Sequence, residues 1–85
     1  MAQVSEREQK NIMATMQSYI DSYNEQYRSW EKNLSDSEWS CLLRYLGHIE
    51  GIKETLESIG YKTMLVMDKK KYCVGPIEKF SMWSA

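Results

Sequence analysis

Histidine and cysteine, which often carry out enzyme chemistry or bind metals, are few in this sequence and are not clustered. It contains one histidine, His48, and two cysteines, Cys41 and Cys73. A structural zinc site needs four ligands, usually in close pairs, so these residues do not predict a metal centre. On a helix, Cys41 and His48 would be about 10 Å apart, which is too far for direct proton transfer between thiol and imidazole. We therefore expect no metal, no cofactor and no catalytic residue, and we expect the protein not to be an enzyme.

The one concentrated charge is a run of three lysines, Lys69, Lys70 and Lys71. At the tip of a hairpin, lysines usually keep the protein in solution and protect the edge of the sheet. They can also contact an acidic protein surface or the phosphates of a nucleic acid. All three interpretations stay open: a solubilising turn, a contact with an acidic protein, and a contact with a nucleic acid. The three lysines are therefore candidate partner-binding residues.

Overall composition narrows the class of protein. The chain has 85 residues and a formal net charge of −1, whereas general nucleic-acid binders show a clear basic excess. The first residues contain no apolar signal region, and no apolar run approaches the length of a membrane span. Two distant cysteines without a secretory signal indicate free thiols in a reducing compartment. We expect one small cytoplasmic domain, residues 1–85, that does not contact a membrane.

A helical stripe of apolar residues predicts a first helix over about residues 6–32. Its members recur every three or four positions: Ile12, Met16, Tyr19, Tyr23, Tyr27, Trp30 and Leu34. Ser5 and Glu8 form a capping box at its start. Two interpretations of the three tyrosines and Trp30 remain open. They are either core side chains packed over a second helix or a partner-binding surface, because Tyr and Trp are enriched in binding hot spots.

A second helix is predicted over about residues 36–59. Ser35 and Glu38 form its capping box, and Leu34 can pack on Trp39 as a hydrophobic staple. The short connection folds this helix back against the first, and Gly60 suits the left-handed position after its end. Its expected buried face comprises Trp39, Leu42, Leu43, Leu46, Ile49, Ile52, Leu56 and Ile59.

Two glycines, Gly47 and Gly51, interrupt the second helix four residues apart. Each costs about 1 kcal/mol relative to alanine inside a helix. Their spacing places one above the other and forms a smooth notch. The notch either accommodates the large tyrosines of the first helix or serves self-association or a partner beside His48.

After Gly60 the apolar pattern changes from helical to extended, which predicts a β-hairpin over about residues 61–74. Residues 61–67 favour a strand, Asp68 and the three lysines form a polar turn, and residues 72–74 form the second strand. Gly75 and Pro76 end it, because proline cannot extend a ladder. Residues 77–85 are expected to be a short apolar tail that folds back on the body or docks on a neighbouring molecule.

The predicted fold is therefore α+β: an antiparallel two-helix hairpin, then a β-hairpin and the apolar tail. Because so small a core is marginally stable, we expect a homodimer or another homo-oligomer. In overall character the chain is similar to small accessory proteins encoded by phages and mobile elements. That resemblance implies a protein that binds and modulates a larger partner, as anti-CRISPR and other anti-defence inhibitors do.

The leading functional hypothesis is a non-enzymatic protein-binding module that contacts a larger protein through Tyr19, Tyr23, Tyr27 and Trp30. The alternative is a small nucleic-acid-associated regulator that uses the lysine run with Tyr61 and Tyr72. A third hypothesis is an enzyme subunit whose site is completed by another chain. Steep salt dependence of binding to DNA or RNA distinguishes the second hypothesis from the first.

Overall fold

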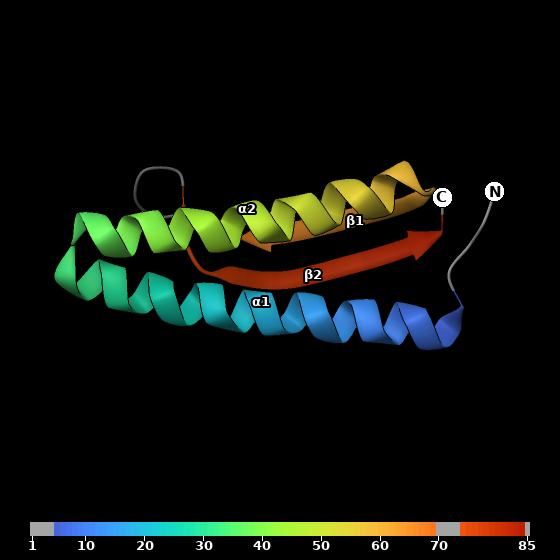
Figure 1. Cartoon of the computed structure of the whole chain (residues 1–85), viewed down its shortest axis with the longest axis horizontal. Helices are drawn as coiled ribbons and strands as arrows, with labels where there is room; N and C mark the ends of the chain where they lie inside the picture. Colours follow the sequence, from blue (N-terminus) through green and yellow to red (C-terminus); the bar gives the residue numbers. More distant parts are fainter. Residues whose placement is uncertain (1–4, 70–73, 85) are drawn as a thin grey trace.

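The computed structural model describes residues 5–69 and 74–84, which form two helices followed by two strands. Helix α1 spans Glu6–Asn33, helix α2 spans Asp36–Ser58, strand β1 spans Tyr61–Met67 and strand β2 spans Ile77–Ser84. Figure 1 shows α1 and α2 side by side and antiparallel, with the two strands behind them. The predicted α+β fold, a helical hairpin followed by a β-hairpin, is confirmed.

Both helices begin at the predicted serine caps. The Ser5 hydroxyl oxygen accepts a hydrogen bond from the Glu8 N–H, and the Ser35 hydroxyl oxygen accepts one from the Glu38 N–H, each at 3.2 Å. These bonds satisfy donors that the first helical turn leaves without a partner. Local sequence signals therefore determine where each helix starts.

The turn between the helices consists of Leu34 and Ser35 alone. Leu34 adopts the left-handed conformation (φ 53°), and its N–H donates to the Trp30 carbonyl at 2.6 Å. Leucine rarely adopts this conformation, because its side chain crowds the backbone. The side chain is 58% exposed rather than buried as the predicted stripe implies.

The hairpin is confirmed, but the predicted position of its second strand is wrong. Residues 77–84, expected to be a tail, form β2, which pairs antiparallel with β1 from Tyr61↔Ser84 to Met67↔Ile77. In the predicted strand, Val74 is a single bridge residue, and residues 72 and 73 lie outside the described part of the chain. Pro76 directly precedes β2, a position where its missing N–H disrupts no ladder. An eight-residue strand also pairs with the whole of β1, which three residues cannot do.

Gly75 allows the connection between the strands to close. A Cβ atom at this position would lie 1.7 Å from the Asp68 carbonyl oxygen. The Asp68 N–H donates to the Pro76 carbonyl at 3.0 Å beside it. Only glycine permits this close backbone approach.

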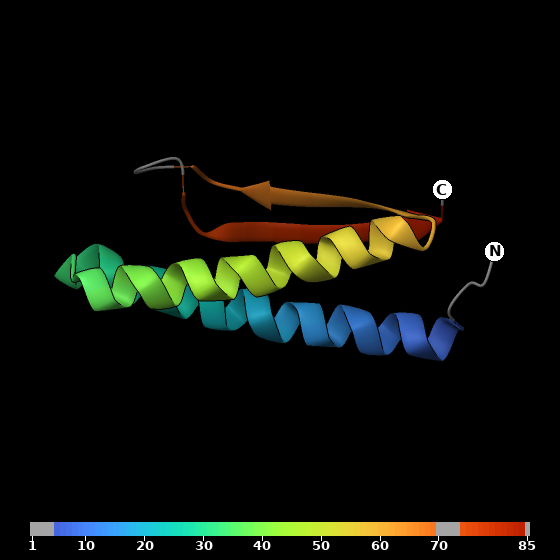
Figure 2. The same cartoon turned by 45° about the horizontal axis from the view of Figure 1, so that its top comes forward.

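The core lies between the helix layer and the sheet. Strand β1 packs against α2 and β2 against α1, and Figure 2 shows the sheet as a separate layer on one side of the helix pair. The buried side chains come from all four elements and from the segment before β2: Met16, Ile20, Tyr23, Tyr27, Trp30, Leu42, Ile49, Leu56, Tyr61, Val74, Ile77 and Phe80. Leu43 was predicted to be buried and is 43% exposed, because it lies on the side of α2 that turns away from both α1 and the sheet.

Candidate binding surfaces

Three of the four aromatic residues proposed as a partner surface belong to the core. Tyr23, Tyr27 and Trp30 are 0%, 1% and 4% exposed. The Trp30 ring packs against Trp39 of α2, with ring centroids 4.8 Å apart. Helix α2 and the hairpin cover these side chains, so the core interpretation holds for them and we exclude them from the candidate surface.

The buried polar tips of this stripe attach the hairpin to α1. The Tyr23 hydroxyl donates to the Gly75 carbonyl at 2.9 Å, and burial raises the pKa of Tyr23 to about 12. Beside it, the Asn24 amide donates to the Ile77 carbonyl at 2.9 Å and accepts from the Ile77 N–H at 2.7 Å. One side-chain amide thus pairs with the first residue of β2 as a neighbouring strand would.

Tyr19, the fourth aromatic residue, is partly exposed. Its ring stacks on His48 of α2 with centroids 5.4 Å apart and an interplanar angle of 23°. Together with Cys41 and Arg44, these residues line a hollow of about 190 Å³. Arg44 was not among the candidate residues predicted from the sequence. It lies three positions after Cys41 and four before His48, a spacing that makes it a neighbour of both on the surface of a helix.

The lysine run is described only in part. Lys69 is exposed just after β1, and its N–H donates to the Met67 carbonyl at 3.1 Å. Lys70 and Lys71 lie outside the described residues. Tyr61, which the nucleic-acid hypothesis combined with the lysine run, is only 5% exposed and is therefore not open to a nucleic acid.

The strands present a second face, the outer sheet face, that points away from the helices. Side chains alternate across a strand, so Lys62, Met64 and Val66 of β1 are exposed whereas Tyr61 is buried. Met64, Val66 and Trp83 are 52%, 36% and 42% exposed. Residues 64 and 66 were detectable from the period of two within residues 61–67. Trp83 was missed because residues 77–85 were assigned to a tail.

Cross-strand pairing brings apolar and basic groups of the outer sheet face together. Lys62 lies opposite Trp83, and Val66 lies opposite Lys79. Side chains directly opposite on one face have Cβ atoms about 5 Å apart. The surface is therefore an apolar strip with a lysine toward each end.

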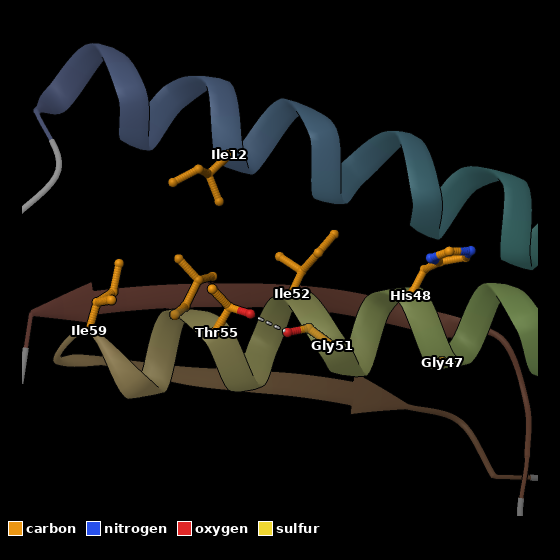
Figure 3. A pocket seen from close by; sticks show the side chains of 8 residues that line it. Ile12, Gly47, His48, Gly51, Ile52, Thr55 and Ile59 are labelled. Carbon is orange, nitrogen blue, oxygen red and sulfur yellow. Dashed lines mark hydrogen bonds between the residues drawn. The ribbon is translucent and has the colours of Figure 1, made fainter.

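A groove of about 480 Å³ opens between α1 and α2. Figure 3 shows Ile12, Ile52 and Ile59 around this space, with Gly47 and Gly51 on α2 beside it. A Cβ atom at either glycine would meet no atom of the described residues within 4 Å. The interpretation that these glycines accommodate the tyrosines of α1 is therefore wrong.

Comparison of the chain with protein-family models, curated proteins and solved structures finds no match. Among residues 5–69 and 74–84, no three His, Cys, Asp or Glu side chains come together in the way a metal site requires. Within the same ranges, neither helix has the length and apolar character needed to cross a bilayer.

Proposed function

We propose that this protein is a non-enzymatic binding module that docks on a larger protein through the outer sheet face. The observation that carries the proposal is the apolar strip of Met64, Val66 and Trp83, each more than a third exposed. Exposed apolar patches bordered by polar residues mark protein interaction sites. A partly exposed tryptophan is a frequent anchor of such sites.

Charge favours an acidic partner. Residues 61–85 contain five lysines and two acidic residues, whereas residues 1–60 contain six basic and ten acidic residues. Lys62 and Lys79 flank the apolar strip directly. An apolar patch bordered by carboxylates complements this face, and opposite charges at the rim of an interface increase its rate of association.

The resemblance to small accessory proteins of phages and mobile elements supports the same kind of function. Such a protein acts by occupying a surface of its partner, which needs no catalytic group. We therefore propose that binding through the outer sheet face inhibits or modulates the partner.

Affinity capture from the host cell, followed by mass spectrometry, identifies the partner. Binding is then measured with purified partner for the wild type, Trp83→Ala and Met64→Ser. Because hot-spot truncations cost at least about 2 kcal/mol, we expect each variant to bind at least ~10-fold more weakly. Leu34→Asn removes an apolar side chain at the helix turn that is more exposed than Met64 or Trp83 and should bind as the wild type does.

Equal loss of affinity in Leu34→Asn and Trp83→Ala would contradict the assignment of the outer sheet face. Titration of a labelled single-stranded oligonucleotide with increasing salt tests the competing hypothesis. Tight binding that falls steeply with salt and requires Lys62 and Lys79 would overturn the proposal in favour of a nucleic-acid-associated regulator.

A further inference from the structure

The groove between α1 and α2 is bordered by exposed backbone of α2 that carries no side chain. Gly47 and Gly51 lie within α2, where glycine is unfavourable, and both are exposed. Their Cβ positions are open, since no described atom lies within 4 Å of them. Nothing described within one copy of the chain therefore requires small residues at these two positions.

A row of residues leads from an exposed leucine into this groove. Residues four apart form a continuous row along a helix surface, and the row through the glycines is Leu43, Gly47, Gly51 and Thr55. Leu43 is 43% exposed at one end of the row. At the other end Thr55 lines the groove, and its hydroxyl donates to the Gly51 carbonyl at 2.9 Å, as Figure 3 shows.

We propose that α2 is a self-association surface and that the occupant of the groove is α2 of a second copy of this chain. The two helices cross at Gly47 and Gly51, where missing side chains let the backbones approach closely. Each helix then continues over the groove of the other copy and covers the exposed faces of Ile52 and Ile59. The crossing also buries Leu43.

Charge supports a second copy as the occupant and determines its direction. On the side of the row toward α1, α2 exposes the basic Arg44, and on the other side it exposes the acidic Glu50 and Glu54. With a two-fold axis along the row, the basic side of each copy faces the acidic side of the other. With the axis across the row, each side would face its own kind. The favoured dimer therefore has both α2 helices running in the same general direction, with Leu43 against Leu43 of the second copy.

The size of the contact implies a weak dimer. A stable interface buries roughly 800 Å² on each partner, and a single helix crossing with its groove is a small contact by that measure. We therefore expect a dissociation constant in the micromolar range, on the order of 1–100 μM. The outer sheet face lies on a different side of the molecule from the row and stays free in this dimer.

Sedimentation equilibrium over a wide range of concentration tests the proposal. We expect the wild type to show a monomer–dimer equilibrium, and Gly47→Leu and Gly51→Leu to weaken it at least ~10-fold, because a leucine holds the backbones apart. Both variants should keep their helical circular dichroism, because a Cβ atom at either position meets no described atom within 4 Å and leucine is a better helix former than glycine. A wild type that stays monomeric at about 1 mM, or leucine variants that dimerise as the wild type does, would overturn the proposal.

A charge exchange tests the direction of the helices. Arg44→Glu and Glu50→Arg should each weaken the dimer by only about two- to fivefold, because an exposed ion pair contributes little. The double variant should regain the affinity, because opposite charges again face each other. If both single variants dimerise as tightly as the wild type, like sides face each other, because each exchange then only replaces one like-charge pair with another, and the proposed arrangement is wrong. Lys32→Glu, an exposed charge change at the end of α1, serves as the control and should leave the equilibrium unchanged.

Discussion

At the scale of single residues, the side chain of Tyr23 combines two roles. Its ring is completely buried in the core, and its hydroxyl bonds the Gly75 carbonyl, 52 positions away in the sequence. A buried carbonyl without a partner is costly, so this hydroxyl holds the segment before β2 against α1. Tyr27 is buried beside it, and its hydroxyl donates to Glu31 at 3.3 Å.

The first prediction concerns Tyr23→Phe. At neutral pH the variant should lose about 1–2 kcal/mol of unfolding free energy, because the Gly75 carbonyl loses its donor. The pKa of Tyr23 is raised from 10.0 to about 12 in the folded state. The stabilising contribution of the neutral phenol is therefore complete below pH 10.0 and is lost as the pH rises toward about 12.

Urea unfolding followed by circular dichroism across the alkaline range measures this effect. The wild type should lose stability more steeply than Tyr23→Phe between these two pKa values. Tyr27 keeps part of the slope in the variant, because burial and Glu31 raise its pKa as well. If the unfolding free energies of the two proteins fall in parallel with pH, ionisation of Tyr23 does not cause the loss of stability at alkaline pH.

At the scale of elements, the turn between the helices combines a strong cap with a strained residue. Hydrogen bonds from Ser29, Ser35 and Asn33 converge on the Glu38 carboxylate and lower its pKa. This network ties the end of α1 to the first turn of α2. Leu34, between the two helices, has a left-handed backbone conformation that is energetically unfavourable for a leucine.

The second prediction concerns Leu34→Gly. Glycine adopts the left-handed conformation without steric cost, and the leucine it replaces is mostly exposed. We expect the variant to gain about 0.5–1 kcal/mol of unfolding free energy, measured by urea denaturation. Leu34→Val should lose a similar amount, because a β-branched side chain suits this conformation least. If valine matches leucine in stability, the left-handed geometry at this position is incorrect.

At the scale of the whole molecule, the helix pair and the sheet depend on each other. A two-stranded hairpin alone is marginal in water, and here its inner face covers the aromatic stripe of α1 and the buried aliphatic face of α2. Ile77 and Phe80 of β2 are 3% and 7% exposed. Strand β2 therefore completes the core and supplies one side of the outer sheet face.

The third prediction concerns deletion of residues 77–85. Burial of a large apolar side chain contributes about 1.5–3 kcal/mol, and small domains have only about 5–15 kcal/mol of stability in total. Loss of Ile77, Phe80 and the partner of β1 should abolish the cooperative thermal transition seen by circular dichroism. Full-length Trp83→Ser, altered only on the outer sheet face, should keep that transition. If the truncated chain unfolds at the same midpoint temperature as the full-length protein, residues 77–85 are not needed for the fold and this prediction is wrong.

Local signals were sufficient to predict the helices and the first strand. The serine caps, the three-to-four-residue spacing of apolar positions and the alternation within residues 61–67 all act over a few neighbouring residues. The ends of α1, α2 and β1 therefore lie within one residue of their predicted positions. The antiparallel helix pair followed from the shortness of the link between them.

Only the tertiary structure decided which apolar residues are core and which are surface. Leu42 and Leu43 are adjacent and chemically identical, yet 0% and 43% exposed, because the direction from which the sheet packs on α2 is not encoded locally. Trp83 and residues 77–84 became a strand because β1 needs a partner along its whole length, a pairing between distant segments. The same long-range packing removed Tyr23, Tyr27 and Trp30 from the candidate surface and left Met64, Val66 and Trp83 exposed in their place.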